Sequence, residues 1–337
     1  MDLVFDKQPA SQRLYSLDNI RAIAIVLVVL GHSIIIYSSD WGIYTSSISV
    51  PEFDYLKKII NLVQMPLFFS LSGFLFGATA YKYTFGAFVL RRAKRLLAPY
   101  LLVAALWMLP IKCAVGYRGY SFLNLPSIYF NDILLGKDMG HLWFLPCLFV
   151  CLILLFCLNL FFKHNRCSQL LLAGFFSLSS LLSGKTEFLN VQLISNVCTY
   201  CIWVYLGFLI FLHYESLRRL FAKRRLMTFM FGALVIIMAA TQILAIHLLA
   251  VPCSILACIL AYAIMPNKEN SILSNISKYS FGIYLFHSPL VYITYTYLPD
   301  ASPLTVLAIN FVLFGLLSYI ISYSVYNSKA RFLLGLS

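Results

Sequence analysis

An arginine and a histidine eleven residues apart bracket the first apolar segment of the chain. Arg21 and His32 enclose the run from Ala22 to Gly31, which contains no charged residue. Eleven residues make almost three whole helical turns, so both side chains fall on one helix face, about 16 Å apart along the axis. An ionisable residue inside a membrane span is costly and marks a functional site by default. With Arg21 at the membrane interface, His32 lies near mid-bilayer, where the pair indicates reaction chemistry at depth.

The composition of the chain is that of a membrane bundle able to position such a pair. Hydrophobic residues make up 61% and charged residues 11% of its 337 residues, whereas a soluble domain has about 25% charged residues. We therefore predict an all-α integral membrane protein, a bundle of about ten transmembrane helices. The predicted spans lie near 19–38, 58–79, 96–115, 141–162, 169–184, 192–212, 226–246, 248–265, 281–298 and 303–327. The uncharged run from Leu226 to Met265 is too long for one span and is expected to turn near His247 and Pro252.

The distribution of positive charge predicts the orientation of this bundle. With both termini in the cytoplasm, nineteen of the 25 lysines and arginines fall in inner segments and six in outer ones, as the positive-inside rule requires. The net charge of +13 then reflects orientation and contact with anionic membrane lipids, and we expect no nucleic-acid partner. We predict one membrane domain over residues 1–337, with no cleavable signal peptide and no appended soluble domain. The longest hydrophilic stretch, 116–140, is expected to be a loop.

The nine cysteines do not predict a disulfide framework or a metal site. Most lie inside predicted spans, where a small apolar side chain suits helix packing. Cys198 and Cys201 have the spacing of a redox or metal motif, but neither a βαβ context nor a second ligand pair accompanies them. We expect no bound metal.

A cluster of basic residues precedes the third predicted span on the cytoplasmic side. It reads Arg91-Arg92-Ala93-Lys94-Arg95, and Arg91 and Arg95 are i,i+4 neighbours on one helical face, with Arg92 beside them. Guanidinium groups bind phosphate oxygens in a bidentate geometry. A purely topogenic role is the alternative, because the positive-inside rule also places such clusters here.

Small residues recur in the second predicted span. Ser70, Gly73 and Gly77 have spacings that permit close contact between helices. Ser72, in the same stretch, is a candidate nucleophile, although no adjacent base is visible in the sequence.

Two further histidines lie in polar and aromatic surroundings. His141 opens the fourth span beside Trp143, and His287 follows Tyr284 about 10 Å into the ninth span. For these residues, as for His32, hydrogen bonding to a neighbouring helix for packing alone is the alternative to a functional role.

Together these stretches resemble acyltransferase family 3, the bacterial membrane O-acyltransferases that decorate cell-surface polysaccharides. The resemblance covers nearly the whole chain, which looks especially like the short members that lack an extra periplasmic domain, such as the enterobacterial common antigen O-acetyltransferase and fucose 4-O-acetylase types. The matching segments are Leu17–Arg21 with His32, Phe68–Phe74, Arg91–Arg95, His141–Phe144 and Gly282–His287. Ala22 departs from the family, which usually has glycine after the arginine.

The resemblance implies an enzyme of the bacterial inner membrane that takes an acyl group, most often acetyl, from cytoplasmic acyl-CoA. No permanently bound cofactor is expected. The acceptor is a hydroxyl of a glycan or lipid-linked glycan, such as an O-antigen or lipopolysaccharide sugar. Arg91, Arg92 and Arg95 would hold the phosphates of CoA.

Catalysis would rest on His32 with Arg21. Neutral imidazole suits a general base that deprotonates the acceptor hydroxyl, and an acyl-imidazole relay is the competing mechanism. Arg21 would pair with Asp18 or bind a donor phosphate. Ser72, His141, Trp143, Tyr284 and His287 are candidate acceptor or supporting residues, with an interfacial aromatic belt as the alternative for the aromatic ones.

Two other classes of protein fit the composition. A polysaccharide-unit flippase, a polymerase or a small-solute transporter is the main alternative, although no paired Gly/Pro-interrupted spans occur in corresponding halves. A non-catalytic scaffold would leave His32 and His287 without a reason. Oligomeric state stays open.

Overall fold

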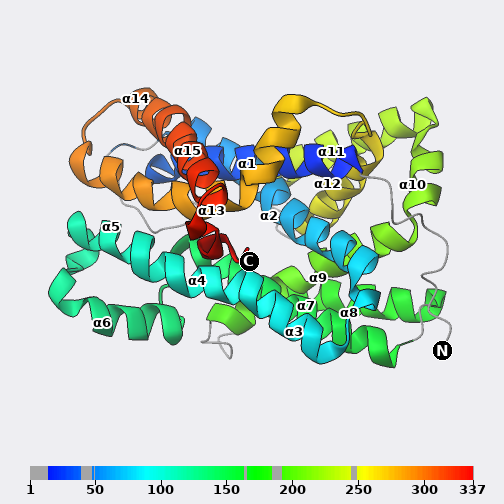
Figure 1. Ribbon diagram of the computed structural model, residues 1–337. Helices are drawn as coiled ribbons and strands as arrows, with labels where there is room; N and C mark the ends of the chain where they lie inside the picture. Colours follow the sequence, from blue (N-terminus) through cyan, green and yellow to red (C-terminus); the bar gives the residue numbers. More distant parts are fainter. Residues whose placement is uncertain are drawn as a thin grey trace.

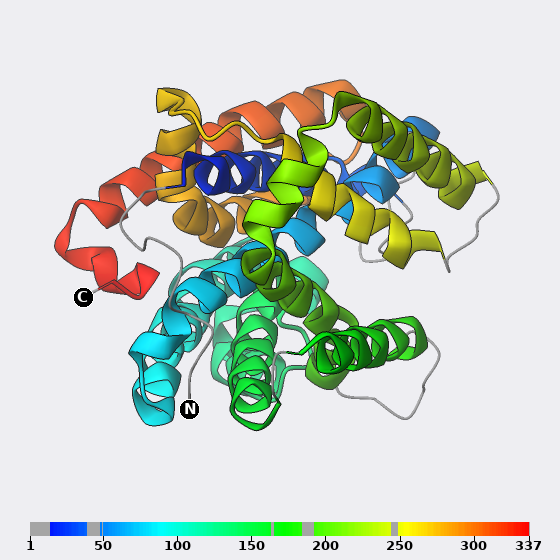
Figure 2. The same cartoon turned by 90° about the vertical axis from the view of Figure 1, so that its right-hand side faces the viewer.

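In the computed structural model, all regular secondary structure is helical within the residues that it describes, 14–38, 48, 50–162, 165–183, 192–243 and 249–336. Figure 1 shows the segments from α3 to α9 gathered in one half of the molecule, with α1 and the C-terminal third gathered in the other. Figure 2 shows the two halves stacked, with α2 running from one into the other. The chain therefore returns, after a long excursion, to pack its last helices against its first.

The described residues up to Leu212 contain nine α-helices. They are α1 (Tyr15–Ser33), α2 (Pro51–Thr79), α3 (Phe85–Arg92), α4 (Ala98–Val103), α5 (Leu109–Ala114), α6 (Leu125–Ile128), α7 (Phe144–Phe161), α8 (Arg166–Ser183) and α9 (Gln192–Leu212). Two π-helical turns, η3 (Ala93–Leu97) and η4 (Ala104–Met108), join α3, α4 and α5, so that Phe85–Ala114 forms one span. π-turns are rare in proteins, and those that occur are often found at functional sites.

The remainder of the chain, from Tyr214, contains six described α-helices and ends in a short turn. They are α10 (Tyr214–Phe221), α11 (Arg224–Ile243), α12 (Ala250–Ile264), α13 (Ser271–Tyr297), α14 (Pro303–Ala308) and α15 (Phe314–Tyr326). The π-turn η10 (Ile309–Leu313) joins α14 to α15, and the 3₁₀ turn η11 (Lys329–Leu334) follows α15. Helix α13 packs against both α1 and α15, so it is the central helix of its half.

Six described segments are long and apolar enough to cross a membrane. They are Tyr15–Ser33, Pro51–Lys82, Phe85–Ala114, Gly140–Phe161, Gln192–Leu212 and Pro303–Tyr326, with a seventh if α10 and α11 form one bent span. The predicted spans 169–184, 248–265 and 281–298 coincide with α8, α12 and α13, which are shorter or less apolar. The protein is thus an all-helical, multi-pass membrane protein, while the count of ten spans stays a prediction.

Two other expectations are refined by the structure. Helices α11 and α12 divide the run from Leu226 to Met265 as predicted, with Pro252 in the first turn of α12 and His247 outside the described residues. The stretch 116–140 is not a plain loop, because it contains α6 and the π-turn η7 (Tyr129–Leu134). Ile133, which is buried, anchors this segment through its apolar side chain.

The predicted close contact of small residues is confirmed between α2 and α9. A side chain at Gly73 would overlap the carbonyl oxygen of Val204, and one at Gly207 would overlap that of Ser70. At Gly77 it would collide with the ring of Phe211. Backbones approach this closely only where small residues line the crossing. This crossing fixes α2, which runs through both halves of the molecule.

Candidate functional site

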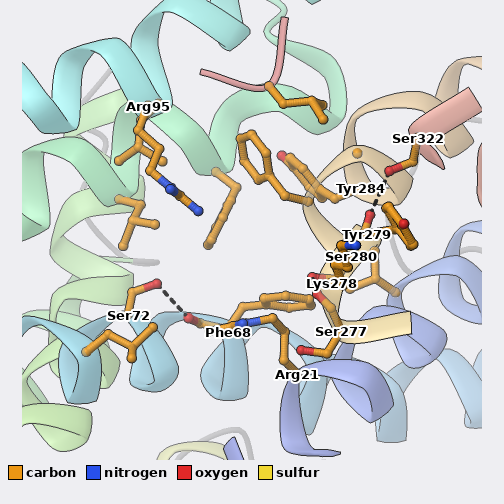
Figure 3. Close-up of a pocket in the computed structure, with 18 of the residues that line it drawn as sticks. Arg21, Phe68, Ser72, Arg95, Ser277, Lys278, Tyr279, Ser280, Tyr284 and Ser322 are labelled. Carbon is orange, nitrogen blue, oxygen red and sulfur yellow. Dashed lines mark hydrogen bonds between the residues drawn. The ribbon is translucent and has the colours of Figure 1, made fainter. Parts of the chain in front are cut away.

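A cavity of about 490 Å³ lies where the two halves meet. Its walls come from α1, α2, the α3–η3 segment, α7, α13, α15 and the C-terminal turn. Figure 3 shows Arg95 entering from the η3 side and Arg21 from the α1 side, with Lys278 and Tyr284 of α13 on the right of the view. Segments more than 200 residues apart in sequence therefore build one site.

The polar wall of this cavity is strongly cationic. Arg21, Arg92, Arg95 and Lys278 line it, and Asp18 is the one carboxylate among the lining residues. Arg21 Nη1 lies 3.7 Å from Asp18 Oδ1, so the arginine both pairs with Asp18 and faces the cavity. Ser277 Oγ donates a hydrogen bond to the same carboxylate oxygen at 3.0 Å. The excess of cations suits a polyanionic ligand.

The predicted arginine cluster is split by the π-turn η3. Arg92 and Arg95 line the cavity, whereas the Arg91 guanidinium lies 5.2 Å from the ring centroid of Tyr83 and is not among the lining residues. The helix between Arg91 and Arg95 is not regular, because a π-turn begins at Ala93. The Nε atom of Arg92 is buried and has no hydrogen-bond partner among the described residues. It is a donor available to a ligand.

The inner end of the cavity is formed by Val28, Phe144 and Tyr284. His32 is not a lining residue, but it lies one helical turn beyond Val28, about 6 Å along α1. Its Nδ1 atom is 2.9 Å from the Val28 carbonyl oxygen. The cavity therefore leads from the arginines toward His32 and stops one turn short of it.

Three histidines from three helical segments meet beyond this end. His32 Nδ1 lies 3.3 Å from His287 Nε2, and the ring centroids of His287 and His141 are 5.9 Å apart. All three are buried, His287 to 2% exposure. Tyr284 donates a hydrogen bond to the His141 carbonyl and so joins the cavity wall to this cluster. The structure brings together the histidines that the sequence presented as separate candidates.

Ser72 and Trp143 occupy different surroundings. Ser72 lines the cavity, where its hydroxyl donates to the Phe68 carbonyl at 3.0 Å, so no base activates it in this structure. Trp143 packs on Tyr200, with ring centroids 4.8 Å apart, inside an aromatic cluster that includes Phe69. Among the described residues, no group of histidine, cysteine and acidic side chains is placed to hold a metal ion.

Comparison with protein families identifies the domain that contains this site. The family model described as an acyltransferase domain, Acyl_transf_3, matches residues 14–327. The chain belongs to acyltransferase family 3. No curated protein and no solved structure matches it. The matched range contains the cavity cations, Asp18 and all three clustered histidines, so the site lies within the acyltransferase domain.

Several site residues of this acyltransferase escaped the sequence analysis. Lys278 lines the cavity but was counted only as an inner positive charge. Lys57 of α2, with 0% exposure, lies against α1, since a side-chain carbon on Gly31 would come within 2.9 Å of Lys57 Nζ and 3.1 Å of Gln64 Oε1. The seven-residue spacing of Lys57 and Gln64 places both on one helix face. That spacing is the signal from which they were detectable.

Lys112 forms a second buried site, at the opposite end of the span Phe85–Ala114 from the arginines. Its ammonium has 0% exposure, lies 3.2 Å from Asp138 Oδ2 and lies about 5 Å from the rings of Tyr117, Tyr120 and Tyr292. Burial raises the pKa of Asp138, but the Lys112 ammonium and a hydrogen bond from Gly140 N–H outweigh it and hold that pKa below its usual value. This network holds the segment between α5 and α7 against α13.

Proposed function

We propose that this acyltransferase is an O-acyltransferase of the bacterial inner membrane, with acetyl-CoA as its donor. It moves the acyl group to a hydroxyl of a cell-surface polysaccharide or of its lipid-linked precursor. His32 acts as general base, with an acyl group carried on His32 as the competing route. The observation that carries this proposal is the cationic cavity that leads to within one helical turn of a buried histidine cluster.

The charge of the cavity supports a donor that carries phosphate groups. Four cationic side chains face one carboxylate, and guanidinium groups bind phosphate through paired, charge-assisted hydrogen bonds. Arg92 and Arg95 would hold the phosphates at the mouth of the cavity, with Lys278 on the facing wall. The pantetheine arm then runs along the apolar wall of Phe68 and Phe144 toward Val28 and Tyr284.

The chemistry of acyl transfer assigns a task to His32. The base takes the proton of the acceptor hydroxyl while the oxygen attacks the thioester carbonyl. The carbon–sulfur bond breaks, and the CoA thiolate leaves and is protonated by the imidazolium. Val28 and Tyr284 lie between the cavity and His32, so the thioester passes these two side chains before transfer.

The position of His141 supports an acceptor that approaches from the other side. His141 opens the span Gly140–Phe161 next to the Lys112–Asp138 network, and Lys112 lies at the other end of the span Phe85–Ala114 from the arginine cluster. Its Nδ1 atom is buried without a hydrogen-bond partner among the described residues. This nitrogen atom is available to accept a hydrogen bond from a sugar hydroxyl.

The test uses purified protein in nanodiscs with acetyl-CoA labelled in the acetyl group, first without an acceptor. We expect both wild type and His32→Gln to bind acetyl-CoA. Release of free CoA by wild type that is lost in His32→Gln would establish acyl transfer, whereas binding without turnover in wild type would point to direct transfer that needs its acceptor. Retained label on wild type alone would favour the acyl-histidine route. Absence of acyl-CoA binding would contradict the proposal and favour a transporter.

A further inference from the structure

His32 and His287 form a hydrogen-bonded pair between α1 and α13. Their rings meet edge to face, with centroids 5.0 Å apart and planes inclined by 75°, and His287 Nε2 lies 3.3 Å from His32 Nδ1. Both side chains are buried, with 8% and 2% exposure. At this depth the arrangement of protons on the two rings is set by neighbouring protein groups.

The backbone determines which nitrogen of each ring carries the proton. His32 Nδ1 faces the Val28 carbonyl at 2.9 Å, and His287 Nδ1 faces the carbonyls of Ile283 at 2.8 Å and Tyr284 at 3.0 Å. A carbonyl oxygen only accepts hydrogen bonds, so both Nδ1 atoms are protonated. In neutral imidazoles both Nε2 atoms then carry lone pairs. His287 Nε2 is therefore an acceptor directed at His32 Nδ1–H.

We infer that His287 is a positioning residue that selects the reactive tautomer of His32. By accepting from His32 Nδ1–H, it leaves His32 Nε2 as the basic nitrogen that takes the proton of the acceptor hydroxyl. The Val28 carbonyl holds the same proton from the helix side. When Nε2 gains its proton, the resulting imidazolium keeps Nδ1–H between Val28 and His287, and the Nε2 proton passes to the CoA thiolate. The inference rests on the proposed function.

The arrangement follows the logic of a catalytic base that a third group orients. In hydrolase triads a carboxylate accepts from the Nδ1–H of the histidine base and stabilises the imidazolium. Here a neutral imidazole and a carbonyl share that task. Lys57, buried beside Gly31, makes the neighbourhood cationic, and a neutral acceptor orients His32 there without a buried ion pair that would need its own compensation.

Two substitutions at the same position separate orientation from packing. His287→Gln places an amide oxygen at the position of Nε2 and keeps an acceptor for His32. His287→Asn places its amide nitrogen at the position of Nδ1, where it donates to the Ile283 carbonyl, but it leaves no acceptor for His32. We expect His287→Asn to lower the kcat of acyl-CoA turnover by about tenfold or more, with an unchanged KM for acyl-CoA. We expect His287→Gln to recover most of that loss.

Nitrogen-15 NMR of histidine-labelled protein provides a readout that does not depend on turnover. The chain has six histidines, and the difference spectrum against His32→Gln identifies the His32 signals. At mildly alkaline pH we expect His32 to carry its proton on Nδ1 in wild type and His287→Gln, and to gain the Nε2-protonated form in His287→Asn. Equal turnover of the two His287 variants, or Nε2 protonation in wild type, would overturn the inference. Wild type without any acyl-CoA turnover would defeat the proposed function instead, while the spectrum still tests the hydrogen bond.

Discussion

At the scale of single residues, the proposed function assigns donor binding to the cavity arginines and reaction to His32. Arg92 and Arg95 line the wide cationic part, and His32 lies one turn beyond its inner end. Changes at the arginines should therefore affect donor affinity, whereas changes at His32 should affect turnover. Arg91 belongs to neither group, since its guanidinium lies over Tyr83 outside the cavity.

The three neighbouring arginines provide a matched test of this division. We expect Arg92→Gln and Arg95→Gln each to weaken acetyl-CoA binding by about tenfold or more, because each removes charge-assisted hydrogen bonds to phosphate. Arg91→Gln, which removes the same charge from the same cluster, should change the Kd by less than about threefold. Isothermal titration calorimetry on protein in nanodiscs measures all three. Equal weakening in the three variants would mean that only the total charge of the cluster matters.

At the scale of helices, the crossing of α2 and α9 determines how the two halves are held. Gly73 allows the two backbones to touch, whereas Gly174 of α8 has open space around it. We expect Gly73→Ala to destabilise the protein by about 1–3 kcal/mol, because the added methyl group forces the helices apart. Gly174→Ala should be neutral or slightly stabilising, since alanine favours the helix.

Thermal unfolding in detergent compares the two glycine variants. It is monitored by the labelling of cysteines that are buried in the folded protein. A lower midpoint for Gly73→Ala alone is the expected result. Equal midpoints would contradict the prediction, because they would mean that α2 and α9 accommodate the added methyl group without loss of stability.

The segment between α5 and α7 depends on the buried Lys112–Asp138 pair. We expect Asp138→Asn to destabilise the folded protein by about 2 kcal/mol, because it leaves the Lys112 ammonium buried without its counter-charge. The expected loss is smaller than for a fully buried ion pair, since the Asp138 side chain is 32% exposed. Lys112→Met in the same chain should recover part of that loss. A double-mutant cycle of unfolding midpoints measures the coupling, and additive effects would contradict a direct interaction.

The same pair predicts an acid-sensitive contribution to stability. The pKa of Asp138 is lowered in the folded protein, so its stabilising effect is present above the ordinary aspartate pKa of about 3.9 and is lost as pH falls through the lower folded value. Unfolding midpoints of wild type and Asp138→Asn should therefore differ at neutral pH and converge below about pH 4. A constant difference across that range would exclude the carboxylate as the cause.

At the scale of the whole molecule, segments from both ends of the chain meet around the cationic cavity. Helices α1 and α13, the arginine segment and the C-terminal turn all border the cavity. The backbone at Gly335 packs directly on that of Arg95. An intracellular donor would reach this cavity if it faces the cytoplasm, as the distribution of positive charge predicts.

Reporter fusions test that orientation. Green fluorescent protein fused to the C-terminal end should fluoresce, and alkaline phosphatase at the same place should be inactive, because each reporter matures on one side only. Alkaline phosphatase inserted after the exposed Gly119 should be active. The reverse pattern would place the cationic cavity outside and would remove cytoplasmic acyl-CoA as its ligand.

The sequence by itself determined the membrane class, most helix positions and the candidate histidines and arginines. It could do so because apolar length, charge bias and helical spacing are local properties that a single segment displays. Arg21 and His32 of one helix were recognisable from their spacing alone. The close crossing at Gly73 was likewise readable from small residues at regular intervals.

Only the tertiary structure decided which of these groups share a site. The π-turn that turns Arg91 out of the cavity, the 3.3 Å contact of His32 with His287 and the place of Lys278 in the cavity wall depend on packing between helices far apart in sequence. Helical periodicity orders residues along one axis, but it does not set the rotation of one helix against another. That rotation follows from packing of whole helix surfaces.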